Sequence, residues 1–191
     1  WSEAEQFANR GNDVCNFKKG LSMRFNTAIL YDIENLLKGY NFSQSFIDKI
    51  SLKEIYESVE NIENVGNVAI QRAYANWSDP RLNVMKGDIV ELGIDPIQIF
   101  GFSRGAKKNV ADIQLAIDAV DLAHTKTAIE VFVIVSGDGG FASLAKKLHE
   151  YGKIVVGCAY KKSANRIFEA VCDDFVWVDD PDDSDIISRV S

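Results

Sequence analysis

Residues 129–141 read IEVFVIVSGDGGF, and this stretch decides the fold. Every residue from Val131 to Val135 is apolar and most are β-branched. The segment 130–135 is therefore predicted to be a strand that is buried on both faces, in the middle of a parallel sheet. The glycines around Asp138 predict a sharp turn, and residues 141–150 a helix. Open parallel sheets bind ligands outside the carboxyl ends of their strands. Because Asp138 lies at such an end, a ligand site is expected at this edge of the sheet.

Strands and helices are predicted to alternate along the rest of the chain. The predicted strands are 26–32, 67–75, 95–100, 130–135, 152–160 and 174–178. Right-handed crossovers then give a three-layer α/β fold with a mostly parallel sheet and helices on both faces. If the sheet changes its direction of growth after the third strand, the first and fourth strands become neighbours. Asp32 and Asp138, which end these two strands, then meet at the switch point.

Several helix boundaries follow from capping and spacing. Asp79-Pro80 predicts a helix start, and Gly93 the end of that helix. Residues 110–124 form a clear helical pattern, with these apolar side chains at helical spacing: Val110, Ile113, Ile117 and Val120. Ser43 or Ser45, Ser51 and Ser163 are predicted caps, the last one for a helix at 164–171. Pro96 is expected at the start of its strand or on a sheet edge.

Composition limits the class of protein. The 191 residues suit one α/β domain, predicted at 24–179, with a tail or peripheral segment at 1–23 and an acidic tail or linker at 180–191. A net charge of -7 does not indicate a broad nonspecific nucleic-acid binder. The three cysteines form no CxxC pair, which fits a reducing compartment. With no signal peptide and no apolar run of transmembrane length, we expect a cytoplasmic protein that does not enter the membrane.

Three carboxylates stand at the ends of apolar segments: Asp32, Asp112 and Asp138. Converging carboxylates suit a hard cation such as Mg²⁺, which polarises a phosphoryl oxygen and supplies a hydroxide nucleophile. The two histidines and unpaired cysteines give no zinc pattern. Asp118 lies about 240° around the helix from Asp112, so we expect it on a solvated face with Asp121.

Three segments carry a resemblance to a known family: AILYDIEN at 28–35, KNVADIQLAIDA at 108–119, and SGDGGF at 136–141. They resemble the signature blocks of the NYN domain, and most closely those of its LabA-like (DUF88) branch, within the PIN-like nuclease superfamily. The resemblance covers roughly residues 24–180. It implies a Rossmann-like PIN fold, Mg²⁺ or Mn²⁺ as cofactor, and cleavage of RNA. Asp32, Asp112 and Asp138 would be the catalytic, metal-binding carboxylates, supported by Asn35 and Ser136.

The chain departs from the family pattern at one position. The usual motif is Ser-Gly-Asp-x-Asp-Phe, and Gly140 stands where the second aspartate is expected. The second metal position, and with it full activity, is therefore in question. Basic side chains near the acidic edge are candidates for phosphate contacts: Arg104, Lys107, Lys108, Lys161, Lys162 and Arg166. Trp77 and Phe102 are candidates for stacking on bases.

Each feature has a simpler interpretation. Asp32 and Asp138 can be strand-end turn residues, and Asp112 can be favoured by the helix dipole. Loop lysines are commonly only solvated, and aromatic residues are commonly core residues. The alternatives to a ribonuclease are a NYN-like RNA-binding or regulatory scaffold without catalysis, and a phosphatase or other phosphoryl-transfer enzyme. RNA is the expected partner, with a homo-oligomer or a further domain as additional possibilities.

Overall fold

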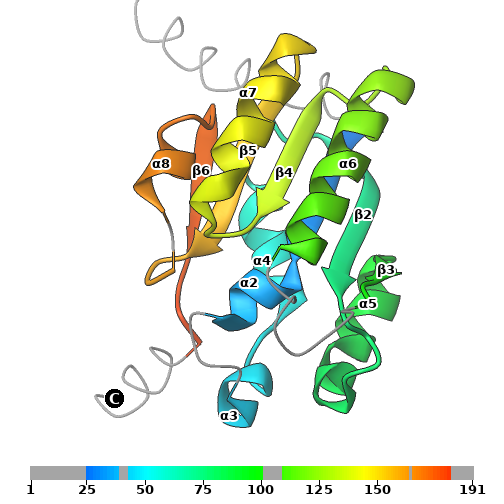
Figure 1. Cartoon of the computed structure of the whole chain (residues 1–191), viewed down its shortest axis with the longest axis vertical. Coiled ribbons are helices and arrows are strands. Elements are labelled where there is room, and N and C mark those ends of the chain that lie inside the picture. The colour runs from blue at the N-terminus through cyan, green and yellow to red at the C-terminus, as the bar shows by residue number, and fades with distance from the viewer. Residues whose placement is uncertain (1–24, 39–42, 101–108, 164, 182–191) are drawn as a thin grey trace, which may run out of the picture.

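The computed structural model describes residues 25–38, 43–100, 109–163 and 165–181. Six parallel strands form one sheet in the order β3-β2-β1-β4-β5-β6. Their bounds are β1 Phe25–Asp32, β2 Asn67–Ala75, β3 Asp95–Gln98, β4 Val131–Val135, β5 Ile154–Tyr160 and β6 Asp174–Val178. The order reverses between β3 and β4, as predicted. The carboxyl ends of β1 and β4 therefore lie side by side (Figure 1).

Helices cover both faces of the sheet, which confirms the three-layer α/β fold (Figure 1). The first face carries α2 Ile33–Lys38, α3 Gln44–Ile47, α4 Leu52–Glu60, a 3-10 helix Pro80–Met85 and α5 Lys86–Leu92. The second carries α6 Val110–Thr125, α7 Ala142–Glu150 and α8 Arg166–Glu169. None of the helices in the described part of the chain combines the length and apolar character needed to span a bilayer.

The strand β4 is buried on both faces, as its sequence predicts. Val131, Val133 and Val135 contribute to the core on one face of the sheet. Phe132 and Ile134 contribute to the core on the other face. Because side chains alternate along a strand, one apolar pentapeptide supplies both hydrophobic cores. This double burial holds the end of β4 in a fixed position beside the end of β1.

The edge strand β3 is shorter than the predicted 95–100 and ends at Gln98. Among the described strands its only partner is β2, whose last residue, Ala75, pairs with Gln98. The Ile99 N–H still donates to the Ala75 carbonyl at 2.9 Å, but β2 ends at Ala75, and Phe100 is 68% exposed. Pro96 lies second in this edge strand, where its missing N–H costs no ladder bond to another strand.

The helix α6 covers the predicted range and extends one residue further, to Thr125. Ile113 and Ile117 are 59% and 57% exposed. The side that packs on the sheet carries smaller side chains, namely Ala111, Leu115, Ala119, Leu122 and Ala123. Alanine allows a helix to lie close to a sheet, and α6 carries apolar residues on more than one side, so spacing alone does not select the side that is covered. An apolar face of α6 is therefore left toward solvent.

The caps agree with prediction in part. Ser51 accepts a hydrogen bond from the Glu54 N–H, and Asp79 caps the 3-10 helix that precedes α5. Gly93 ends α5 with a φ of 65°. The prediction for α8 was wrong, because its cap is Asn165, whose side chain accepts from the Ile167 N–H. The Ser163 hydroxyl instead donates to the Tyr160 carbonyl and closes the turn that follows β5.

The expected acidic tail begins with a buried residue. Asp180 is 1% exposed, and one of its carboxylate oxygens accepts a hydrogen bond from the Lys162 N–H at 3.2 Å. The packed part of the chain thus continues through Asp180, one residue past the expected boundary at 179.

Candidate active site

Asp32 lies at the end of β1 and is fully buried. One carboxylate oxygen accepts a hydrogen bond from the Asn35 N–H at 3.1 Å, so the side chain caps the first turn of α2. The other oxygen accepts from the Ser136 hydroxyl at 3.0 Å. This carboxylate is therefore held from two sides, by the helix that follows it and by the residue that follows β4.

The turn after β4 is tied to the end of β1 by further hydrogen bonds. The Ser136 hydroxyl oxygen accepts from the Asp138 N–H at 3.1 Å while it donates to Asp32. The Asn35 side-chain oxygen accepts from the Gly137 N–H at 2.9 Å. Ser136 and Asn35, expected to support the site, thus fix the two strand ends relative to each other.

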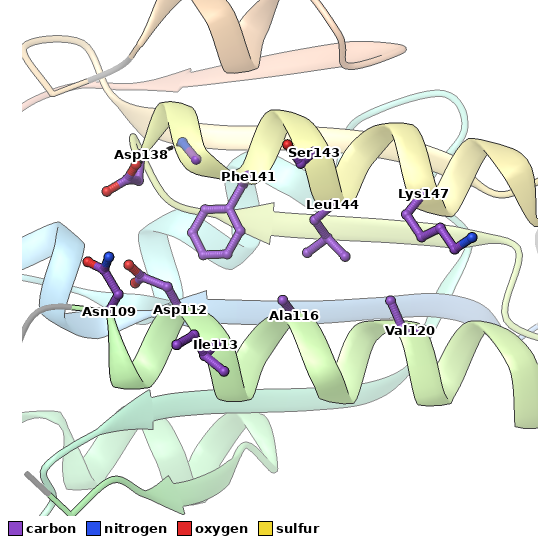
Figure 2. A pocket seen from close by; sticks show the side chains of 11 residues that line it. Asn109, Asp112, Ile113, Ala116, Val120, Asp138, Phe141, Ser143, Leu144 and Lys147 are labelled. Carbon is purple, nitrogen blue, oxygen red and sulfur yellow. Dashed lines mark hydrogen bonds between the residues drawn. The ribbon is translucent and has the colours of Figure 1, made fainter.

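Asp138 caps the 3-10 helix Gly139–Phe141. Its carboxylate accepts a hydrogen bond from the Gly140 N–H at 2.8 Å. This contact is the turn role that the simpler interpretation assigns to an aspartate beside glycine. The carboxylate also lines a cavity, so the capping contact leaves it facing the candidate site (Figure 2).

The two glycines that flank Asp138 allow the turns after β4 and β5 to pack closely. A Cβ on Gly137 would lie 2.3 Å from the Ser163 carbonyl oxygen, and one on Gly139 would lie 2.8 Å from the Asn165 side chain. Gly140 is different, because the nearest atom to its Cβ position is an oxygen of Asp138 at 3.2 Å. Two of the three glycines are thus required by backbone packing, and Gly140 is not.

Gly137→Ala is expected to destabilise the protein by roughly 1–3 kcal/mol, because the new methyl group must displace backbone at Ser163. Gly87→Ala is the matched control. Nothing lies within 4 Å of that Cβ position, so it should stabilise α5 by roughly 0.5–1 kcal/mol. Urea unfolding of the two variants measures both effects. Equal stability of Gly137→Ala and the wild type would mean that the contact between these turns is looser than described.

Asp112 reaches the same site from the first turn of α6. With Asp138 and Gly140 it lines a cavity of about 480 Å³ between α6 and α7 (Figure 2). Its carboxyl group also interacts electrostatically with that of Asp32. Asp112 therefore stands between the other two carboxylates and contacts both the buried one and the cavity.

The pKa values of two of these groups are raised. Burial, and then the nearby Asp112 carboxylate, raise the pKa of Asp32 to about 7. Burial, and then the charge of Asp138, raise the pKa of Asp112, whereas Asp32 and Lys38 lower it. Both shifts mean that ionised carboxylates are crowded in a poorly solvated place. A cation bound there would relieve the repulsion.

The donor set fits a hard divalent cation at the pair formed by Asp32 and Asp112. Two neighbouring carboxyl groups that influence each other electrostatically offer the oxygen ligands that Mg²⁺ and Mn²⁺ prefer. A closed cluster is absent from the described ranges, where no three His, Cys, Asp or Glu side chains are grouped so as to hold a metal ion together. Asp138, with one oxygen on the Gly140 N–H, adds negative charge to the pair.

The predicted phosphate-binding residues are only partly described. Arg104, Lys107 and Lys108 lie outside the described residues, as does Phe102. Lys161 forms an ion pair with Asp179, so its charge is partly compensated. Arg166 is exposed at the start of α8, next to Asn165, which packs against the Asp138 turn. Trp77 is a core-packed residue whose indole N–H donates to the Ala73 carbonyl at 3.1 Å.

Some site features were missed at the level of sequence. Lys38, at the end of α2, acts electrostatically on Asp112. In the sequence, the only indication of this role is the position of Lys38 in the last turn of the helix that follows Asp32. Asp121 is exposed as expected, but Asp118 is not on a solvated face. It accepts hydrogen bonds from Arg72 at 3.1 Å, Tyr74 at 2.8 Å and Gln114 at 2.8 Å. Asp118 therefore joins α6 to β2.

Comparisons with known proteins identify the family and the fold. The NYN domain family matches residues 26–179. No curated protein matches the chain in sequence. One similar solved structure is a crystal structure of a protein of unknown function from Vibrio parahaemolyticus RIMD 2210633. It has a TM-score of 0.63 and 21% sequence identity, and the match covers 83% of this chain and 95% of that chain. At that identity the likeness concerns the fold alone.

Proposed function

Because the chain belongs to the NYN domain family, we propose that it is a metal-dependent ribonuclease of the PIN-like superfamily, in the LabA-like (DUF88) branch. It hydrolyses phosphodiester bonds of RNA with Mg²⁺ or Mn²⁺. The observation that carries the proposal is the Asp32 carboxylate, fully buried at a strand end, fixed by Ser136 and Asn35, and adjacent to Asp112. A buried, crowded carboxylate pair destabilises a fold, which favours a functional reason for it.

The residues have distinct roles in this proposal. Asp32 and Asp112 hold the metal ion, which when bound polarises a phosphoryl oxygen of the substrate. Ser136 fixes the orientation of the Asp32 carboxylate, and Asn35 keeps the turn after β4 in place. Asp138 adds charge at the cavity. The RNA strand is positioned by basic side chains that contact its backbone phosphates: Lys161, Arg166, Arg104, Lys107 and Lys108.

Asp112→Asn is expected to lower metal-dependent RNA cleavage at least tenfold, because it removes a ligand charge while keeping the shape of the side chain. Asp121→Asn is the matched control, since it makes the same change on an exposed site of the same helix. Both proteins are assayed on single-stranded and structured RNA with Mg²⁺, with Mn²⁺ and with a chelator. Equal residual cleavage by wild type and Asp112→Asn would identify a contaminating nuclease and refute the proposal.

The second candidate function is an RNA-binding or regulatory scaffold that has lost catalysis. Gly140, in place of the usual aspartate, and the net charge of -7 favour it. It predicts RNA binding without cleavage under any metal condition. A phosphatase would instead turn over a small phosphoester and leave RNA intact, so a small phosphoester belongs in the same assay.

Partner and location are part of the proposal. RNA is the partner, and assembly with a second copy or with a further domain is compatible with it. We also propose a cytoplasmic location, because the thiols of Cys158 and Cys172 are both free, as expected in a reducing compartment.

A further inference from the structure

The solvent-facing side of α6 is apolar and adjoins the candidate active site. Ile113 and Ile117 are more than half exposed, and Ala116 and Val120 lie between and beyond them on the same side. Apolar side chains at this spacing form a continuous stripe along a helix. Exposed stripes of this kind mark binding surfaces.

The cavity beside Asp112 and Asp138 has two walls of different chemistry (Figure 2). The α6 wall presents Ile113, Ala116 and Val120. The α7 wall presents Leu144, but also the hydroxyl of Ser143 and the ammonium of Lys147. Lys147 lies at the end opposite Asp138 (Figure 2). Beyond Asp112 the α6 wall is thus apolar, whereas the α7 wall carries a polar and cationic rim.

We propose that this groove between α6 and α7 binds a nucleotide next to the scissile phosphate, with its base on the α6 wall and its phosphate at Lys147. The inference rests on the proposed function and adds the substrate subsite. The groove opens onto Asp112 and Asp138, so whatever occupies it lies against the candidate metal site. Its volume of about 480 Å³ lies within the usual range for small-ligand sites.

The charges favour this orientation of the nucleotide. Asp112 and Asp138 repel a phosphate at one end of the groove, whereas Lys147 attracts one at the other. Lys147 is 47% exposed, and its ion pair with Glu150, which is 64% exposed, is a weak surface pair. The ammonium can therefore exchange from Glu150 onto a phosphate oxygen at little cost.

The α6 wall cannot distinguish one base from another. Ile113, Ala116 and Val120 have no side-chain hydrogen-bond donor or acceptor, so they contact the flat face of a base and not its edge. A base in a duplex is stacked and paired and cannot enter the groove. The subsite therefore selects an unpaired nucleotide without reading its identity.

The test measures the contribution of the bases to binding. Fluorescence anisotropy compares octauridylate with the same ribose-phosphate chain without bases. The protein is Asp32→Asn in a chelator, where metal-dependent cleavage does not interfere. We expect octauridylate to bind about tenfold more tightly than the base-free chain. In the same background, Ala116→Leu should fill the groove and reduce this affinity ratio about fivefold. Ala170→Leu, on the exposed end of α8, is the matched control and should leave the gain unchanged.

Lys147 is tested by charge neutralisation. Lys147→Gln should weaken the binding of octauridylate and of the base-free chain about threefold. It should also reduce the slope of log affinity against log salt concentration by about one, as expected for the loss of one phosphate contact. Lys146→Gln makes the same change on the neighbouring residue, which does not line the groove. The change in log affinity that it causes should be less than half of that caused by Lys147→Gln.

Three outcomes would overturn the inference. One is a folded Ala116→Leu variant with the full base contribution, and another is equal effects of the two lysine variants. The third is a wild-type dimer in analytical ultracentrifugation that Ala116→Leu dissociates, because a second copy would then cover the stripe. Loss of cleavage and of all RNA binding in every variant, wild type included, would instead refute the proposed function itself.

Discussion

Asp32→Asn is expected to stabilise the metal-free protein above pH 8 by about 3 kcal/mol. The folded state holds the pKa of Asp32 at about 7, against an ordinary value of 3.8. Ionising this carboxyl group in the folded protein therefore costs up to about 4 kcal/mol more than in the unfolded chain. Asparagine keeps the hydrogen bond from the Asn35 N–H, but its amide nitrogen cannot accept the hydrogen bond from the Ser136 hydroxyl. The loss of this bond offsets about 1 kcal/mol of the gain in the free energy of unfolding.

The pH dependence gives this prediction its sign. Below about pH 4 the carboxyl group is protonated in both states, and Asp32 imposes no penalty. Between pH 4 and 7 the unfolded state ionises first, so the wild type loses stability as the pH rises. Above pH 7 the penalty is complete. The advantage of Asp32→Asn should therefore be absent at pH 4 and complete at pH 8, as measured by urea unfolding at each pH.

Divalent metal should reverse the ranking of the two proteins. Millimolar Mg²⁺ or Mn²⁺ binds the folded wild type and should raise its melting temperature, whereas Asp32→Asn should gain little. Asp121→Asn, an exposed control, should follow the wild type at every pH and with every metal. A melting temperature of Asp32→Asn below that of the wild type at pH 8 without metal would show that the buried carboxylate stabilises the fold, contrary to the argument.

Gly140→Asp is expected to increase metal affinity and RNA cleavage more than tenfold. It places a further carboxylate at the cavity beside Asp138, and a unit charge about 4 Å from a cation contributes several kcal/mol at a partly solvated site. The backbone of Gly140 has no positive φ, and its Cβ position meets only the Asp138 side chain, at 3.2 to 4.0 Å. The substitution therefore requires the Asp138 carboxylate to move by a few tenths of an ångström, and nothing more.

Gly140→Asn separates charge from shape in this experiment. It adds the same number of side-chain atoms without the negative charge, so it should displace Asp138 equally and gain no affinity. Calorimetric titration with Mn²⁺ measures the affinity, and the RNA assay measures the rate. If Gly140→Asp gains metal affinity but cleaves no RNA, the scaffold function is favoured. If neither property changes, the missing carboxylate is not what limits this site.

Prediction from sequence succeeded where local pattern and tertiary environment agree. The segment 130–135 is apolar on both faces, and only the middle of a covered parallel sheet buries both. That placement brings the residue after β4 next to Asp32. No single residue predicts that β1 pairs with β4. That prediction came from the general rule that the strand order of an open parallel sheet reverses at a switch point.

Prediction failed where two local solutions are equivalent. The helical spacing in α6 left open which side packs on the sheet, because one side carries Ile113 and Ile117 and the other Leu115 and alanines. Ser163 and Asn165 are both good caps, and the end of β5 selects Asn165. Asp118 looked like a surface residue because its partners come from β2, more than 40 positions away.

The strand order also determines when the acidic site can form during folding. Asp32 and Ser136 are 104 residues apart, and β1 lacks its second neighbour until β4 has been synthesised and has paired with it. A nascent chain that ends before residue 131 has one open edge on β1 and no hydroxyl donor for the Asp32 carboxylate. Closing so long a loop is entropically costly and slow. The contact that fixes the Asp32 carboxylate through Ser136 is therefore formed late, when most of the domain has already left the ribosome.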